Sequence, residues 1–227
     1  FRQLFFNGKR QVRARWPKFE WGKPESGGRA FMEGPAEEGS HIAFKYKPST
    51  LRHRWTKPQE VEVNVFPYAA WCNNIVPVAS IDEEKRIVTL QRETWRSGTM
   101  STGEDFIRYG DLPFQPGNRF VVENVLEELE EPGEWCLDSE EGTVYFMSPE
   151  ELTDDSHVVA PLLHCLMDFQ GVSHVTISGF TFTETATGDN YHRFGLDGYG
   201  VMFPIRGWKY CGESLHMKDT SYCTVER

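Results

Sequence analysis

The sequence lacks any run of eighteen or more apolar residues, so it predicts no ordinary membrane-spanning helix. It also lacks a basic excess, because 24 Lys and Arg stand against 34 Asp and Glu, a net charge of −10. An acidic chain repels polyphosphate, so we expect no nucleic acid and no membrane among its partners. One basic cluster near the start is interpreted as the solvated face of a strand rather than a binding patch: Lys9, Arg10, Arg13 and Arg15.

Cysteine is scarce, and its spacing carries little information. The five cysteines are an odd number without a CxxC pair, so the sequence predicts neither a zinc site nor a complete disulfide framework. Buried thiols are the expectation. A calcium-binding loop of the DxDxDG kind is also missing, and we expect no metal and no cofactor. The cysteines are Cys72, Cys136, Cys165, Cys211 and Cys223.

A helical pattern is nearly absent as well. The best candidate, residues 121–131, is crowded with carboxylates and β-branched side chains and predicts one or two turns at most. Elsewhere short alternating runs lie between Gly, Pro, Asn and Asp, a pattern typical of strands with one solvent-facing side. With 39% hydrophobic and 14% aromatic residues, the 227-residue chain can bury a core in one or two domains. The clearest predicted strands are 61–66, 86–90 and 135–138.

Two hairpins are indicated by their turns. FRQLFFNGKRQVRARW contains Asn7-Gly8, the dipeptide that most strongly favours a two-residue hairpin turn. GEWCLDSEEGTVYFMSP predicts a longer turn at 139–142 and a return strand at 143–147. Residues from about 40 to 150 therefore predict an antiparallel β-sandwich. The Gly-, Pro- and Glu-rich stretch WGKPESGGRAFMEGPAEEGSH predicts an exposed loop before it.

After about residue 160 the sequence contains an internal match. MDFQGVSHVTI (167–177) aligns with LHMKDTSYCTV (215–225) at an offset of 48 residues, interpreted as two coils of about 24 in a β-solenoid. In HVTISGFTF, Gly179 permits a sharp corner between strands. A terminal coil exposes an apolar end, so we expect the solenoid to continue past Arg227 or to be capped. Since the chain starts at Phe1 and residues 224–227 read as a strand in progress, we expect a fragment.

Three stretches together carry a family resemblance: FRQLFFNGKRQVRARWP, NRFVVENVLEELEEPGEWCLDSEEGTVYFMSP and HVTISGFTFTETATGDN. They resemble secreted right-handed parallel β-helix proteins of the glycoside hydrolase type, β-xylosidase- or fucosidase-like, which carry an inserted β-sandwich. The resemblance covers residues 1–16 and 115–227. It implies an all-β chain with a junction hairpin at 1–18, an inserted antiparallel β-sandwich-like domain with a long loop at 19–160, and parallel β-helix coils at 161–227. It also implies a secreted or periplasmic protein.

The candidate chemistry is glycosidic cleavage, which needs two carboxyl groups flanking the bond. Neighbouring coils stand about 4.8 Å apart, close to the roughly 5 to 5.5 Å expected of a retaining pair. The richest polar stretch is 183–200, interpreted as a loop leaving the β-helix wall. Glu184 faces either a groove or plain solvent, Asp189 is also an ordinary turn former, and Glu213 follows Gly212 at a strand entrance. The candidate catalytic carboxylates are Glu184, Asp189 and Glu213.

Sugar-binding residues are expected in the same region. Aromatic side chains suit the apolar faces of sugar rings, although most aromatic residues here equally suit packing. Trp208, beside Gly207 and Lys209, is the preferred sugar platform, and His192 is either a structural hydrogen-bonding residue or a contact to a sugar hydroxyl. The candidate substrate-binding residues are Tyr191, His192, Trp208 and His216.

The resemblance favours one functional hypothesis over two alternatives. The chain is interpreted as part of a carbohydrate-active β-helix enzyme, a glycoside hydrolase acting on plant or algal polysaccharide or oligosaccharide through paired carboxylates. Its partners are then the glycan substrate and the remaining coils of the same parent chain, and we expect this piece to be inactive alone. The alternatives are a non-catalytic carbohydrate-binding or adhesion β-helix and a polysaccharide lyase. The lyase ranks below the hydrolase because no calcium loop is present.

Overall fold

The computed structural model describes residues 1–19, 28–52, 54–66, 74–94, 97–102, 105–111, 113–186 and 214–226. In this part of the chain the regular elements are strands, apart from two single-turn 3₁₀ helices, η1 (Pro58–Glu60) and η2 (Leu126–Glu128). The all-β prediction is therefore confirmed, and η2 confirms the short turn expected within 121–131. No helix of these ranges is long and apolar enough to cross a membrane.

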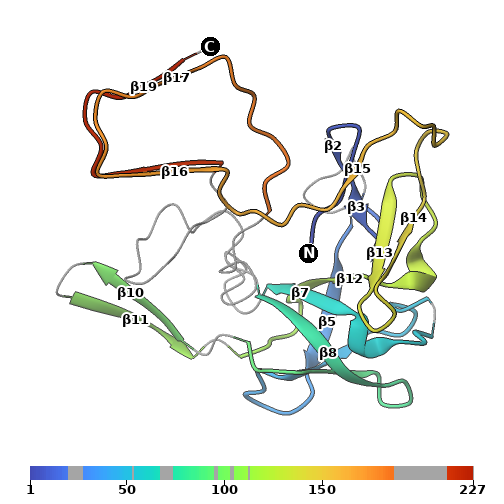
Figure 1. Cartoon of the computed structure of the whole chain (residues 1–227). Coiled ribbons are helices and arrows are strands. Elements are labelled where there is room, and N and C mark those ends of the chain that lie inside the picture. Colours follow the sequence, from blue (N-terminus) through green and yellow to red (C-terminus); the bar gives the residue numbers. More distant parts are fainter. Residues whose placement is uncertain are drawn as a thin grey trace.

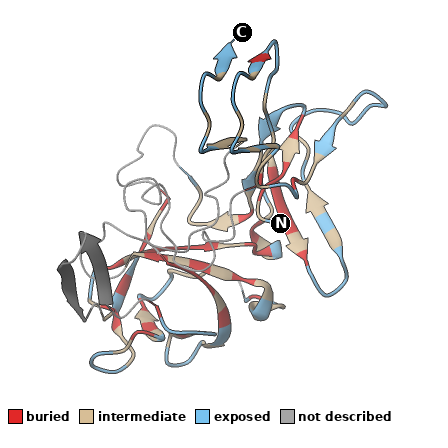
Figure 2. Ribbon diagram, turned by 60° about the vertical axis from the view of Figure 1, so that its left-hand side comes forward, coloured by how far each residue is buried: buried red, intermediate tan, exposed pale blue. Residues whose placement is uncertain are grey.

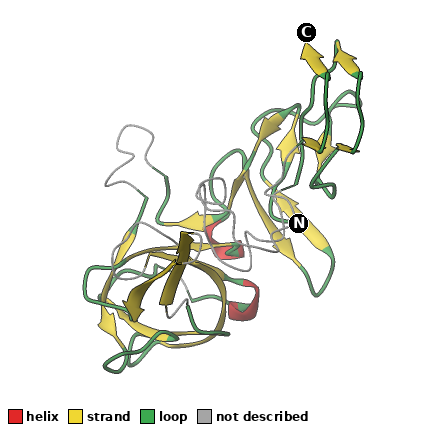
Figure 3. Ribbon diagram, turned by 90° about the vertical axis from the view of Figure 1, so that its left-hand side faces the viewer, coloured by secondary structure: helices red, strands yellow, loops and turns green. Residues whose placement is uncertain are grey.

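An antiparallel sheet that closes on itself forms one body of the molecule (Figures 1 and 3). Strand β12 (Arg119–Glu123) closes it, because β12 pairs with both β5 (Ala30–Pro35) and β7 (Glu62–Phe66). The expected pair of stacked sheets is wrong for this part, which is a barrel-like closed sheet. The ring continues through β6 (Ala43–Tyr46), β9 (Ile87–Leu90) and β8 (Asn74–Asp82), and β4 (Arg15–Trp16) also pairs with β12. Strands β10 (Ser97–Thr102) and β11 (Asp105–Asp111) form a separate two-stranded sheet.

The barrel encloses the main hydrophobic core, shown by the buried stretches in Figure 2. Buried and half-buried residues alternate along β6, β7 and β9, which is the two-residue period of strands with one face in a core. Register shifts in β5 between Met32 and Gly34, and in β8 between Val78 and Ser80, mark bulges. Bulges bend a strand and increase its twist, which favours closure over two flat sheets.

Strand β5 corrects one sequence prediction. Residues 30–35 belong to the stretch expected to be an exposed loop, yet Ala30 and Met32 are only 7% and 1% exposed in the barrel core. The alternation of Ala30, Met32 and Gly34 on one face supplies the apolar side, and the glycine stands at the bulge. Composition alone masked this alternation, because Gly, Pro and Glu flank it on both sides.

Both predicted hairpins are confirmed. Strands β1 (Phe5–Phe6) and β2 (Lys9–Arg10) pair across Asn7 and Gly8, whose φ angles of 49° and 75° are the positive values that the primed turn requires. Strands β13 (Glu134–Asp138) and β14 (Thr143–Phe146) form the second hairpin. Strand β3 (Val12–Arg13) lies parallel to β13, and β15 (Val158–Val159) pairs with β1. Chain segments on either side of the barrel residues therefore meet, while the domain boundaries at 18 and 160 stay predictions.

The basic cluster divides into two pairs. Lys9 and Arg10 are exposed, as predicted. Arg13, however, forms an ion pair with Glu62, and Arg15 donates to two backbone carbonyls. Burial lowers the pKa of Arg15. The prediction of a wholly solvated basic face is thus wrong for Arg13 and Arg15, because the turn of the chain into the barrel carries both side chains inward.

The internal match corresponds to parallel pairing. Strand β16 (Met167–Gln170) pairs in register with β18 (Leu215–Lys218), and β17 (Thr176–Ser178) with β19 (Thr224–Glu226), so Figure 1 shows two traces running one over the other. The alignment at 48 residues is confirmed, including Ser173 opposite Ser221. The interpretation of 48 residues as two coils is wrong, because the aligned segments are direct neighbours. These strand pairs form two stacked rungs, and a complete β-helix stays a prediction.

The two rungs also repeat their backbone conformation. Gly171 and Asp219 have φ angles of 64° and 52°, and His174 and Tyr222 have φ angles of 59° and 53°. The rings of His174 and Tyr222 stack at 5.0 Å and 6°. Left-handed residues at matched positions turn each rung at the same point, so the second rung can lie on the first.

Asn124 ties the barrel to the β13–β14 hairpin and supports a stability prediction. It is 4% exposed, and its Nδ2 donates to the carbonyls of Glu60 and Leu137 at 2.9 and 2.8 Å, while its Oδ1 accepts from the Leu137 N–H at 2.9 Å. Its φ of 63° is tolerated by asparagine but costs an alanine about 1 kcal/mol. We expect Asn124→Ala to lower the free energy of unfolding by about 2–3 kcal/mol, measured by urea denaturation.

A matched variant separates the two contributions. Asn124→Gly loses the same hydrogen bonds but accepts the positive φ, so it is expected to be less destabilised than Asn124→Ala. An unfolding midpoint of Asn124→Ala equal to that of the unchanged chain would show that these hydrogen bonds of Asn124 do not stabilise the fold.

Candidate functional site

The candidate site lies on the outer face of β16 and β18, here called the rung face and defined by Asp168, Gln170, His216 and Lys218. Register places Asp168 opposite His216 and Gln170 opposite Lys218. Because alternate residues of a strand share a face, these four polar side chains lie on one side of the two-stranded sheet. Asp168, Gln170 and Lys218 are exposed and His216 is half-buried. The rung face is therefore accessible to a ligand.

The central contact joins Asp168 to His216. His216 Nδ1 lies 2.8 Å from Asp168 Oδ1, and the side chains are 25% and 39% exposed, respectively. Gln170 Nε2 donates to the second oxygen, Oδ2, at 2.8 Å. An ionised carboxylate only accepts, so Nδ1 carries the hydrogen, and when the ring is neutral Nε2 is its acceptor atom. The arrangement thus orients the imidazole ring of His216 on β18.

Glu184 lies on a segment that reaches the same rungs. Thr185 Oγ1 lies 3.4 Å from Ser214 Oγ, and the Ala186 N–H donates to the Leu163 carbonyl at 2.9 Å. Ser214 immediately precedes β18, so the Glu184 segment and the His216 strand meet there. Glu184 itself is half-buried with a φ of 59°. A left-handed backbone at a residue other than Gly or Asn is uncommon and is found preferentially at functional sites.

Five predicted site residues lie outside the described residues and stay predictions: Asp189, Tyr191, His192, Trp208 and Glu213. Of the predicted residues, the structure places Glu184 and His216 on adjoining segments. Within the described ranges, no group of three or more His, Cys, Asp or Glu side chains is arranged to hold a metal ion.

Asp168 is the functional candidate that the sequence prediction missed. The offset of 48 residues already placed Asp168 opposite His216, because Met167 aligns with Leu215. The signal was therefore present in the alignment, but its meaning depended on the two segments being direct neighbours rather than two coils apart.

A second polar group lies at a hollow of about 160 Å³ beside η1 and β13. Lys57 Nζ lies 2.5 Å from Asp138 Oδ2 and 3.5 Å from Glu141 Oε1. The hydrogen bond from Lys57 and that from the Glu141 backbone hold the pKa of Asp138 below its ordinary value. The hydrogen bond to Asp138, with the negative charges of Asp138 and Glu141, raises the pKa of Lys57. An ammonium held this firmly is no base or nucleophile, so we interpret this pair as structural.

Comparison with known proteins addresses the fold. No family model matches the chain, and no curated protein matches it. A solved structure named glycoside hydrolase matches with a TM-score of 0.59 and 20% sequence identity, covering 87% of this chain and 33% of that one. The chain thus spans about a third of the length of that structure. The likeness shows an all-β, glycoside hydrolase-like fold.

Proposed function

We propose that this chain is part of a carbohydrate-active enzyme, a glycoside hydrolase with a parallel β-helix, and that the rung face forms part of its substrate cleft. The observation that carries the proposal is the in-register stacking of Asp168 on His216, which presents an oriented acceptor beside the Glu184 segment. The glycoside hydrolase-like fold supports the same class.

Each residue of the site has a proposed role. His216 Nε2 accepts a hydrogen bond from a sugar hydroxyl, and Asp168 positions the ring. Asp168 is less suited to attack a sugar, because both of its oxygens accept hydrogen bonds from the rung face. Glu184 is the proposed acid or nucleophile, with Asp189 and Glu213 as the further carboxylate candidates of this chain.

The proposed enzyme is secreted or periplasmic and acts on polysaccharide or oligosaccharide. Since this chain covers 33% of its structural neighbour, a second catalytic carboxylate can come from further rungs of a longer chain. Stacked rungs suit this arrangement, because their spacing of about 4.8 Å resembles the separation of a retaining pair.

The first experiment measures turnover of a panel of aryl glycosides and soluble glycans by the longest form that the reading frame provides, with the 227-residue chain in parallel. His216→Asn is expected to raise KM about tenfold with little change in kcat, because one hydrogen bond to substrate is lost. Asp168→Asn is expected to raise KM in the same direction and to change the pH profile, since the ring loses its fixed tautomer.

The matched control is Lys47→Ala, which removes an exposed charge from the barrel and should leave KM unchanged. Absence of turnover by every form, together with retention on a glycan column that depends on His216, would replace the hydrolase with a binding module. Turnover with an unchanged KM in His216→Asn would remove the rung face from the cleft.

A further inference from the structure

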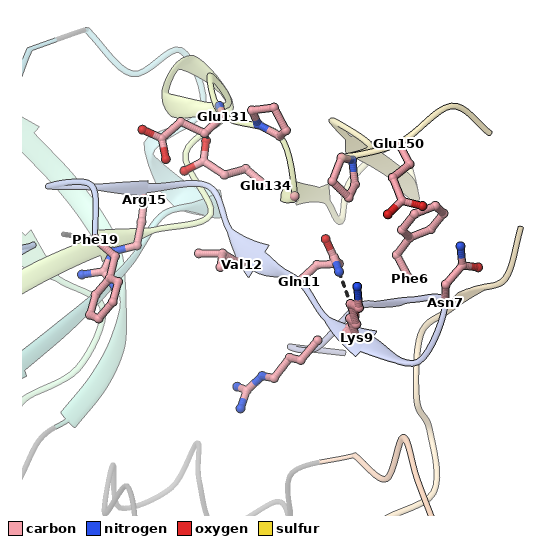
Figure 4. A pocket seen from close by; sticks show the side chains of 14 residues that line it. Phe6, Asn7, Lys9, Gln11, Val12, Arg15, Phe19, Glu131, Glu134 and Glu150 are labelled. Carbon is pink, nitrogen blue, oxygen red and sulfur yellow. Dashed lines mark hydrogen bonds between the residues drawn. The ribbon is translucent and has the colours of Figure 1, made fainter. Parts of the chain in front are cut away.

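A separate hollow of about 680 Å³ lies between the opening hairpin and the loop before β13, here called the hairpin groove (Figure 4). Its volume is in the range of small-molecule sites, about 300–1,000 Å³. Figure 4 shows Lys9, Gln11 and Val12 along the hairpin, with Glu131 and Glu150 across the groove. None of its lining residues belongs to the rung face.

The charged side chains of the groove are balanced in number and available to a ligand. Lys9 and Arg10 come from β2, while Glu131 and Glu150 come from the facing loops, and all four are exposed. In the described part of the chain, none of these four makes an ion pair within 4.0 Å. Glu134, by contrast, is held by Lys18.

This balance selects a class of ligand. Lys9 and Arg10, whose side chains point to opposite faces of β2, donate hydrogen bonds, and Glu131 and Glu150 accept them. Hydroxyl groups both donate and accept, so an uncharged polyhydroxylated molecule can use both kinds of group at once. An anionic ligand would meet Glu131 and Glu150, and a cationic one would meet Lys9 and Arg10, at a cost from like charges in each case.

The remaining lining offers apolar contacts. Phe19 and Val12 are 36% and 40% exposed, while Phe6 lines the groove with only 3% exposure. Pro132 and Pro149 add rigid apolar surface on the other side. Flat apolar surfaces beside a few polar groups suit the C–H faces of sugar rings, with hydroxyls directed to the charged rims.

We propose that the hairpin groove is an ancillary binding site for a short neutral oligosaccharide, separate from the rung face. The choice of a sugar as the polyhydroxylated ligand rests on the proposed function. The site itself is argued from the volume of the groove, its exposed charges of both signs and its apolar lining residues.

The test uses backbone amide NMR shifts of the ¹⁵N-labelled chain, titrated with xylotriose, cellotriose and, as an anionic comparator, trigalacturonate. The neutral sugars are expected to shift the amides of Asn7, Gln11 and Gly133, which line the groove. The double variant Lys9→Ala/Glu150→Ala is expected to weaken their binding at least tenfold. The double variant Lys47→Ala/Glu151→Ala, which removes exposed charges outside the groove, should bind as the unchanged chain does.

Three results would overturn the site: no groove shift with either neutral sugar, binding that Lys9→Ala/Glu150→Ala leaves intact, or tighter binding of trigalacturonate. The rung face is read independently from the amides of Asp168 and His216. Groove shifts without glycoside turnover would support this site while the proposed hydrolase fails. Rung-face shifts alone would support the substrate cleft and remove the ancillary site.

Discussion

Glu184→Gln is expected to lower kcat by about 10²- to 10⁴-fold in the longest form of the chain, the range associated with loss of a positioned acid or base. The substitution keeps the size and shape of the side chain but removes its charge and its proton. Three observations select Glu184: its left-handed backbone, its partial burial, and the contact of the next residue, Thr185, with the start of β18. The measurement is kcat on an aryl glycoside, with folding checked by thermal denaturation.

Glu226→Gln is the matched control for this prediction. Glu226 is an exposed carboxylate on β19, away from the rung face, and its amide should leave kcat unchanged. Azide added to Glu184→Ala distinguishes the two roles, because the anomeric configuration of the glycosyl azide differs between replacement of the nucleophile and replacement of the acid, which acts as the base in the second step. Full activity of Glu184→Gln would show that this carboxylate performs no catalytic step.

The largest effect on stability is expected at Glu134, which lies at the junction of the opening hairpin, the barrel and β13. Its side chain is 5% exposed, and its two oxygens each lie 2.8 Å from Lys18 Nζ. Oε2 also accepts the N–H groups of Glu130 and Glu131, each at 3.0 Å. One carboxylate therefore accepts hydrogen bonds from two nearby amides and from the ammonium group of Lys18, which is 116 residues away in sequence.

Glu134→Ala is expected to lower the free energy of unfolding by about 3–5 kcal/mol, because it leaves two amides without their acceptor and a largely buried ammonium with only the Glu128 carbonyl and no counter-charge from Glu134. Lys18 is 15% exposed, so water cannot replace the lost contacts fully. Urea denaturation at neutral pH measures the change. The dependence of the free energy of unfolding on urea concentration should be the same in both proteins, so that the same two states are compared.

Two further variants test the reason for this loss. Glu131→Ala removes the neighbouring exposed carboxylate and should change stability by less than about 0.5 kcal/mol. Adding Lys18→Met to Glu134→Ala should restore part of the stability, because the unpaired charge is removed. If Glu134→Ala costs less than about 1 kcal/mol, the network is not a stabilising junction.

Local chemistry accounts for the parts of the fold that were predictable. Asn7-Gly8 forms its turn because both residues accept positive φ, whatever surrounds them. Segments 167–177 and 215–225 match in sequence and form paired strands, because equivalent positions in stacked rungs have the same environment. Both signals are carried by short segments or by their repetition.

The parts that were missed depend on residues distant in sequence. Residues 30–35 become a core strand because β6 and β12 supply partners. Arg13 turns inward because Glu62 stands on a strand 49 residues away. In the candidate site, His216 was predicted from its residue type alone. Asp168 becomes a candidate only through its contact with His216, 48 residues away.

The all-β class, the two hairpins and the register of the parallel match follow from the amino-acid pattern, since turn propensity and strand periodicity act over a few residues. The folded structure alone reveals that the antiparallel sheet closes into a barrel, that the matched segments are direct neighbours, and that Asp168 orients His216. Those outcomes depend on which strand edges meet and which charges become buried together, and these are properties of packing between segments far apart in the chain.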